Sequence, residues 1–400
     1  MESELRAYHQ LFAERFVLRE RRPAAARRRA AQSAAPAWEP AELWLDEGAV
    51  TIHQAEVAKT LGHPAGGLAL VTDMLPERYP GFDDAGRVSA ELWPGPAAVY
   101  LIYASPLGAT LLDRRLYLPP AWFGEDQPRP ELENAVPAWV TFKTGPALGT
   151  EMIQAVLAAG QLPVRCIALD EAYCQEFQLL DDLHRKAQTY LITISRHQRF
   201  WFKPADDAWQ PLPADRLAAR LPASAWYADT PADSVAVVRA ALDRHGQPGP
   251  EGWLIIRRPA ESRAVDEWRF FQTNAPAAAP ISALALWTAW QAHPQAVLEA
   301  CQLDAAAPAP GWAGWHHHTA LTMLAHHFLV RLQSKFGAAA PALSVPQARQ
   351  VLQCVLPQAE FDITLAVDEI KHIQLHNLHA YFKLDAAGGA EPADPYCYVI

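Results

Sequence analysis

The stretch Gly311-Trp-Ala-Gly-Trp-His-His-His318, continued by Thr319-Ala-Leu-Thr-Met-Leu-Ala-His-His-Phe-Leu329, gives the first view of the fold. Leu321, Leu324, Phe328 and Leu332 recur at three- or four-residue spacing, which predicts an amphipathic helix entered through a glycine and tryptophan turn. Neighbouring side chains on a helix point about 100° apart. The three adjacent histidines therefore cannot converge on one metal ion, and the segment is expected to close a hydrophobic core.

Composition describes a folded protein in a reducing compartment. Half of the 400 residues are hydrophobic, no apolar run is long enough to cross a bilayer, and the first residues lack the apolar centre of a signal peptide. The five cysteines are odd in number, dispersed and free of C-x-x-C pairs, which is typical of reduced structural thiols. We therefore expect a cytoplasmic protein with no membrane segment.

Two short apolar runs each end in an acid. Leu68-Ala-Leu-Val-Thr-Asp73 follows a glycine-rich turn, and Val164-Arg-Cys-Ile-Ala-Leu-Asp170 follows the expected helix 148–159, which Gly160 stops. Such runs predict buried strands that deliver Asp73 and Asp170 to their ends. Between them, 97–105 and 109–119 predict a hairpin across the turn at Gly108.

The remainder alternates strands and helices. Residues 189–194 predict a strand, 200–250 read as peripheral, 252–258 and 268–276 predict a strand pair, and 281–301 predicts a helix that Pro294 kinks or restarts. Residues 1–35 and 41–61 read as helices, 74–96 as a loop with weak strand character, and Ser344 as the N-cap of a last helix.

These motifs resemble, in order, insertion-sequence DDE transposases of the type named for insertion sequence seven-oh-one. The resemblance spans residues 68–357 and includes L-D-x-R-L-Y-L-P from Leu112, F-K-T from Phe142, D-x-A-Y from Asp170 and the W-H-H-H segment. It implies an α/β fold with an RNase H-like core, a β-rich insertion, and flanking N- and C-terminal helices. The expected regions are an N-terminal helical region 1–67, core parts 68–200 and 281–340, an insertion 201–280, and a C-terminal region 341–400.

The resemblance also implies a catalytic centre in which three carboxylates surround two divalent ions, for which Mg²⁺ is suited. Asp73 resembles the first acid and Asp170 the second, and both would be metal ligands. Counting back from His316 with one inserted residue brings Gln291 to the third position, and Leu298 to that of a lysine seven residues later. Gln291 is neutral and binds a divalent ion weakly. Glu299 is a candidate substitute, with His293 and Glu171 as weaker ones.

Charge argues against a strong grip on DNA over the whole chain. Forty-four acids face 34 bases, a formal charge of −10, whereas DNA-binding proteins usually carry a basic surplus. The candidate nucleic-acid-binding residues are local basic ones: Arg27, Arg28, Arg29, Arg114, Arg115 and Lys143.

Three functions follow. The first is a domesticated transposase with a degraded site, repurposed to bind DNA or a protein partner. The second is an active Mg²⁺-dependent transposase, expected to be a homodimer. The third is an enzyme of another class that uses the same cleft.

Overall fold

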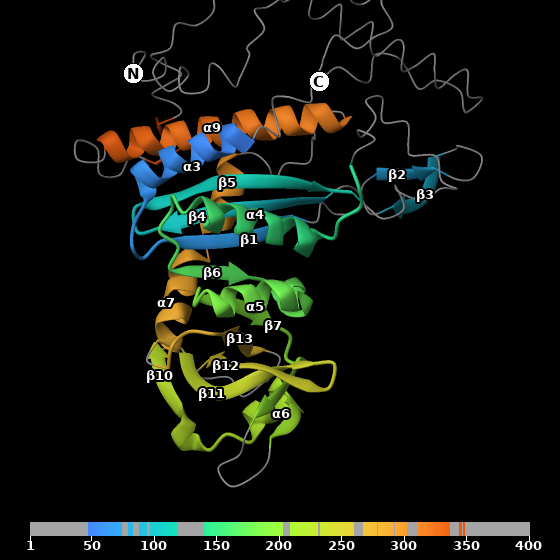
Figure 1. The fold of residues 1–400 in the computed structure, drawn as a ribbon, viewed down its shortest axis with the longest axis vertical. Helices are drawn as coiled ribbons and strands as arrows, with labels where there is room; N and C mark the ends of the chain where they lie inside the picture. The colour runs from blue at the N-terminus through green and yellow to red at the C-terminus, as the bar shows by residue number, and fades with distance from the viewer. Residues whose placement is uncertain are drawn as a thin grey trace, which may run out of the picture. The chain divides into compact units, whose positions relative to one another are not determined.

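The structure, a computed structural model, describes most of the chain between residues 47 and 348 (Figure 1). The described segments are 47–73, 79–82, 88–93, 97–118, 140–202, 209–230, 233–259, 267–277, 279–291, 293–301, 311–336, 344–345 and 347–348. All of them belong to one compact unit, Ser3–Ala348. The helix predicted at 1–35, the Arg27–Arg29 segment and the tail beyond 348 lie outside the described residues.

The described residues form an α/β fold around one large, mostly antiparallel sheet. Its strand path is β5-β4-β1-β6-β7-β13-β12-β11-β8-β9, with β10 paired to β11. The first five strands of this path are β5 (Gly108–Tyr117), β4 (Ala97–Ser105), β1 (Gly67–Asp73), β6 (Cys166–Leu169) and β7 (Tyr190–Ile194). The strands predicted at 68–73, 97–105, 109–119, 164–170 and 189–194 are therefore confirmed.

Strand direction changes at β1. β1 pairs antiparallel with β4, and β4 pairs antiparallel with β5 across the Gly108 turn, where φ is +135°. On its other side β1 is parallel to β6, and β6 is parallel to β7. Parallel neighbours need a crossover connection, usually a helix. Helices supply both crossovers here: α4 (Gly145–Ala159) precedes β6, and α5 (Phe177–Arg185) precedes β7.

Local sequence explains the limits of α4. Thr144 caps its first turn, because the Thr144 hydroxyl accepts a hydrogen bond from the Ala147 amide at 3.2 Å. Gly160 ends it in the left-handed region at φ 62°, where glycine has no steric penalty. The apolar side of α4, including Met152 and Ile153, packs with Leu68 and Leu70 of β1 in the main core.

Strands β8 to β13 extend the sheet beyond β7. They share antiparallel pairing and are β8 (Arg199–Phe202), β9 (Gln210–Pro213), β10 (Trp226–Thr230), β11 (Asp233–Arg244), β12 (Gln247–Pro259) and β13 (Arg269–Thr273), with α6 (Ala214–Ala219) after β9. The predicted pairing of 252–258 with 268–276 is confirmed by β12 and β13. The peripheral character expected for 200–250 is wrong, because β11 buries Val235 and Ala236 completely.

Residues 74–96, expected as a loop with weak strand character, contain a hairpin. β2 (Tyr79–Phe82) and β3 (Val88–Trp93) pair antiparallel in a separate two-stranded sheet.

The remaining helices are α3 (Glu47–Leu61), α7 (Pro280–Trp290), α8 (His293–Ala300) and α9 (Gly311–Phe336). α3, α8 and α9 contact β5, whereas α7 contacts β6 and β7; Figure 1 shows α3 and α9 beside β5. The break expected at Pro294 is confirmed, since α7 ends at Trp290 and Pro294 stands in the first turn of α8. Ser344 caps the next turn as expected, with its hydroxyl 3.3 Å from the Gln347 amide. No described helix could span a bilayer.

The turn expected at Gly311–Trp315 is wrong, because α9 starts at Gly311 and this segment is its first turn. Trp315 is only 8% exposed and packs with Leu298 and Met323 against β4 and β5. Burial of a tryptophan is worth more than the helix cost of nearby glycines, about 1 kcal/mol each.

The contact between α4 and the sheet predicts the cost of one methyl group. A Cβ on Gly149 would lie 2.0 Å from the Tyr173 hydroxyl and 3.1 Å from Leu70 Cδ1. Gly149→Ala should therefore lower the free energy of unfolding by about 1–3 kcal/mol in urea denaturation. Tyr173→Phe removes the nearest atom, so the double variant should lose less than the sum of the two single losses. Additive losses would contradict this contact.

Candidate functional site

Two acids close neighbouring parallel strands. Asp73 is the last residue of β1, and Asp170 directly follows β6. The register pairs Gly67 with Cys166 and Ala69 with Ala168, so β1 and β6 run together toward the same edge of the sheet. Each acid stands at the end of an apolar strand, as the sequence predicted, and the pairing of β1 with β6 makes these two strands neighbours. The side chain of Asp73 lies outside the description.

Asp170 is held in place by its own backbone. Its carboxylate oxygen Oδ1 accepts a hydrogen bond from the Ala172 amide at 2.9 Å, which caps the short 3-10 helix η2 (Glu171–Gln175). Burial raises the pKa of Asp170 above its usual range; the Ala172 hydrogen bond opposes this shift, and the nearby charge of Glu171 adds to it. Glu171 itself is exposed. A partly buried carboxylate beside another acid is typical of a functional site.

The residue predicted at the third-acid position stands at a helix end. Gln291 is the C-cap of α7, is exposed, and donates its backbone N–H to the Trp287 carbonyl at 2.8 Å. Glu299 is also exposed, and its Oε1 accepts a hydrogen bond from the Gln295 amide at 3.1 Å. His293 is half-buried at the start of α8. Leu298 is 2% exposed and belongs to the core under α9, so its position serves packing.

The donor set at the strand ends suits a divalent cation of the Mg²⁺ type. Asp73 and Asp170 offer hard carboxylate oxygens, and only one oxygen of Asp170 is engaged by the Ala172 amide. Within the described residues, no three His, Cys, Asp or Glu side chains gather in a way that could hold a metal. In the described part, Asp170 is the carboxylate at this edge whose side chain is placed, and the backbone of Asp73 ends the neighbouring strand.

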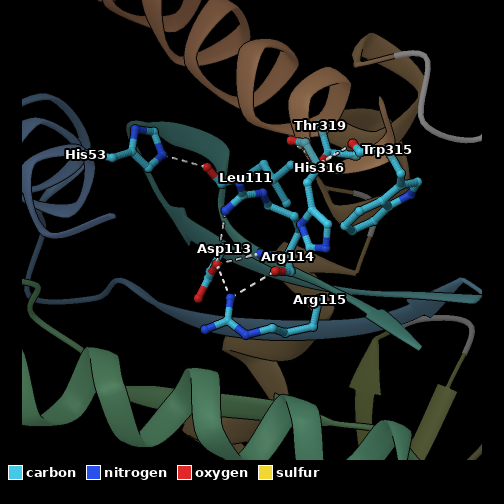
Figure 2. Close-up of polar contacts among 8 residues, drawn as sticks. All are labelled: His53, Leu111, Asp113, Arg114, Arg115, Trp315, His316 and Thr319. Carbon is cyan, nitrogen blue, oxygen red and sulfur yellow. Dashed lines mark hydrogen bonds and ion pairs between the residues drawn. The ribbon is translucent and has the colours of Figure 1, made fainter. Parts of the chain in front are cut away.

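One predicted nucleic-acid contact needs correction. Arg114 is 3% exposed and lies near Asp113, itself 2% exposed, with 3.7 Å between Arg114 Nη1 and Asp113 Oδ1 (Figure 2). The guanidinium is not presented to a phosphate. Alternation along β5 is broken by an irregularity, since Leu101 pairs with Asp113 whereas Ile102 pairs with Leu111. This bulge sets which face each following residue occupies.

The other two described candidates remain accessible. Arg115 is 28% exposed and donates to Asp113 Oδ1 at 2.7 Å (Figure 2). Lys143 is 42% exposed and pairs with Glu151 at 2.6 Å. A phosphate would have to compete with Asp113 for Arg115 and with Glu151 for Lys143. Nucleic-acid binding by these two residues stays a prediction.

The histidine-rich helix forms part of the core. His316 is 2% exposed and lies beside Trp315, with ring centroids 4.8 Å apart (Figure 2). Further along α9, His326 Nδ1 lies 3.1 Å from the Thr110 hydroxyl of β5. The expectation that these histidines close a core is confirmed for the described side chains.

Sequence reasoning missed two partners of this helix on α3. His53 is fully buried and packs edge-on against His327. Its Nε2 donates to the Leu111 carbonyl at 2.9 Å (Figure 2). Glu56, 5% exposed, accepts from Arg331 at 2.9 Å. Burial lowers the pKa of His53 and of His326 to about 4. The sequence signal that could have found His53 and Glu56 is their position among the apolar residues of the helix predicted at 41–61.

The described cysteines are reduced. Cys166, Cys174 and Cys301 are buried and free, and burial raises the pKa of each thiol to about 12. Burial and a raised pKa are typical of structural thiols, the role that the sequence predicted for them.

Residues 87–253 match the family model of the DDE superfamily endonucleases. The match supports a DDE-type transposase family. It runs from the hairpin strand β3 into β12, so it includes Asp170 but stops short of Asp73 and Gln291. A comparison with curated proteins finds no match.

The ionised form of Asp170 should lower the free energy of unfolding relative to its protonated form, because the carboxylate is partly buried. Because its folded-state pKa is raised, the folded protein holds a proton more tightly than the unfolded chain, and stability falls as pH rises through that window. Asp170→Asn keeps an acceptor for the Ala172 amide without the charge. We expect a higher melting temperature than wild type at pH 7 and no difference near pH 3. A less stable variant at pH 7 would contradict the assigned burial cost.

The buried histidines predict acid sensitivity. In the unfolded chain His53 has a pKa of 6.5, whereas in the folded protein its pKa is about 4. Between these two pH values only the unfolded chain takes up a proton at His53. Stability is therefore full above pH 6.5 and decreases by about 2–3 kcal/mol from this residue by pH 4.5. His53→Gln retains a donor for Leu111 and should flatten this dependence in urea denaturation at pH 7 and 4.5. The exposed His197→Gln is the control, and equal pH dependence in both variants would refute the assignment.

Proposed function

We propose that this chain is a transposase-derived DNA-binding protein with an RNase H-like core, in which the third catalytic acid has been replaced by Gln291. The observation that carries this proposal is the junction at β1. Three antiparallel strands, β5-β4-β1, continue into two strands parallel to β1, and the two acids close the neighbouring parallel strands. This order and these directions are typical of an RNase H-like core, and the DDE endonuclease match supports the same family.

Asp73 and Asp170 would hold a divalent cation, Mg²⁺ by the chemistry of their oxygen ligands. When bound, such an ion would polarise a phosphate oxygen and lower the pKa of a water. The protein itself orients Asp170 through the Ala172 amide and keeps it partly desolvated, which strengthens its attraction for a cation.

Loss of the third acid is the basis for proposing domestication. Gln291 provides a neutral amide where the resemblance implies a carboxylate, and Leu298 is core where it implies a lysine. Glu299 is not a ready substitute, because it is exposed and hydrogen-bonded to Gln295 within α8. A site that keeps Asp73 and Asp170 but lacks the third acid can still bind a cation and DNA, but it would not catalyse strand transfer efficiently.

Restoring the acid is the direct test. We expect wild-type protein with Mg²⁺ or Mn²⁺ to nick DNA at background level, and Gln291→Glu to raise metal-dependent nicking at least ten-fold, about 1.4 kcal/mol in barrier. Gln295→Glu adds the same charge at an exposed position of the next helix and should have no effect. Calorimetry should detect a cation in wild type and not in Asp73→Ala or Asp170→Ala.

Two results would overturn the proposal. Efficient cleavage and joining by wild type, lost in Glu299→Gln, would identify an active Mg²⁺-dependent transposase that uses Glu299. No cation binding at millimolar metal, together with no retention on DNA, would indicate a transposase fold used for a different purpose.

A further inference from the structure

The insertion strands align two arginines and a tyrosine in one row. Arg269, the first residue of β13, pairs with Arg257 of β12. Arg257 in turn pairs with Val235 of β11, and Val235 pairs with Tyr227 of β10. Residues directly opposite each other in antiparallel strands share a face of the sheet, with Cβ atoms about 5 Å apart. The four residues therefore lie in register on one face of the sheet, one on each of four strands. Figure 1 shows these strands, β10 to β13, together beyond β7.

This row carries exposed positive charge. Arg269 is exposed and makes no ion pair with any residue that the structure describes. Arg257 is 15% exposed and binds Asp233 at 2.7 Å, which offsets its charge. Val235, the third member of the row, is fully buried, while Tyr227 is 44% exposed, so the exposed side chains of the row are Arg269 and Tyr227 at its two ends. Like charges directly opposite each other are unfavourable in a sheet. Asp233 lessens this repulsion by neutralising Arg257, so Arg269 is the member of the row whose charge is left for an anion.

The row lies close to the two-acid edge. β6, β7 and β13 are consecutive in the sheet, and Leu169 aligns with Ile192, which aligns with Gln272. Continuing this register by one residue puts Asp170 in line with Phe271. Arg269 stands two residues before Phe271 in β13, so both lie on the same face of the sheet. Strand spacing of about 4.8 Å and a rise of about 3.4 Å per residue then separate the Asp170 and Arg269 Cα atoms by roughly 12 Å. Along one strand of double-stranded DNA, that span corresponds to about three to four nucleotides at about 3.4 Å of rise each.

We propose that the row Arg269–Arg257–Val235–Tyr227 is a binding surface for the nucleic-acid strand that leaves the two-acid site. Arg269 contacts a phosphate, Arg257 lies beside it in the row, and Tyr227 stacks on a base. This inference rests on the proposed DNA-binding function and assigns the β-rich insertion to gripping the substrate beside the acids. The planar guanidinium matches phosphate geometry, and an exposed aromatic ring accepts any base.

The same row explains how an acidic protein can hold DNA. A formal charge of −10 opposes non-specific attraction, so phosphate contacts must be concentrated on a local surface. Arg269 is suited to this role because no described carboxylate pairs with it.

Salt-dependent anisotropy with a fluorescent single-stranded oligonucleotide tests the proposal on the full chain. Arg269→Gln should weaken binding several-fold at about 0.1 M salt and reduce the slope of log K against log salt by about 0.7, the value for one lost phosphate contact on a single strand. Arg220→Gln is the matched control, because Arg220 is exposed at the C-cap of α6. It should leave affinity and slope unchanged.

Tyr227→Ala separates stacking from charge. We expect roughly ten-fold weaker binding with an unchanged salt slope, since stacking releases no counterions. Circular dichroism melting of each variant checks that the fold is retained.

The outcomes distinguish the row from the proposed function. If wild type binds DNA and Arg269→Gln matches Arg220→Gln, the row is refuted while the DNA-binding proposal stands. If wild type shows no salt-dependent binding, both fail. Equal losses in Arg269→Gln and Arg220→Gln would indicate general charge attraction and would also refute the row.

Discussion

The pairing of β1 on both of its sides is the constraint on which the structure depends. β4 lies antiparallel on one side and β6 parallel on the other, so β1 is the point at which the sheet changes direction. An antiparallel neighbour can follow through a short turn, but a parallel neighbour requires the chain to cross the sheet. The α4 crossover satisfies that requirement and delivers the end of β6 to the end of β1. Asp73 and Asp170, 97 positions apart by their numbering, become neighbours only through this pairing.

The parts of the fold that local sequence determines were predictable. The runs 68–73 and 97–105 are apolar and flanked by glycine or proline, and they coincide with β1 and β4. The long strands β11 and β12 were harder to recognise, because Ala236, Ala240 and Ala241 have low strand preference and β12 starts with Gln247-Pro-Gly-Pro. Their conformation comes from pairing with each other along almost their whole length.

The candidate site was predictable to the same degree. Acids that follow apolar strands can be read from the sequence, whereas the fate of Arg114 depends on a bulge in β5, which no local pattern encodes. The role of His53 was also hidden, since its partner is a carbonyl 58 residues away. The arginine row could not be foreseen either, because Arg257 and Arg269 meet only through strand register.

The joining of α3 to α9 has a consequence for how the protein is made. β5 is the outermost strand of its end of the sheet, and both helices contact it. The Glu56–Arg331 ion pair that links the helices spans 275 residues of sequence. On the ribosome, α3 can pack against β5 as soon as that strand is made, but the part of β5 that α9 contacts stays uncovered until α9 has emerged. Surface that is transiently exposed in this way favours association with other chains. This exposure of β5 during synthesis ends only when α9, which is made late, packs against β5 and against the early helix α3.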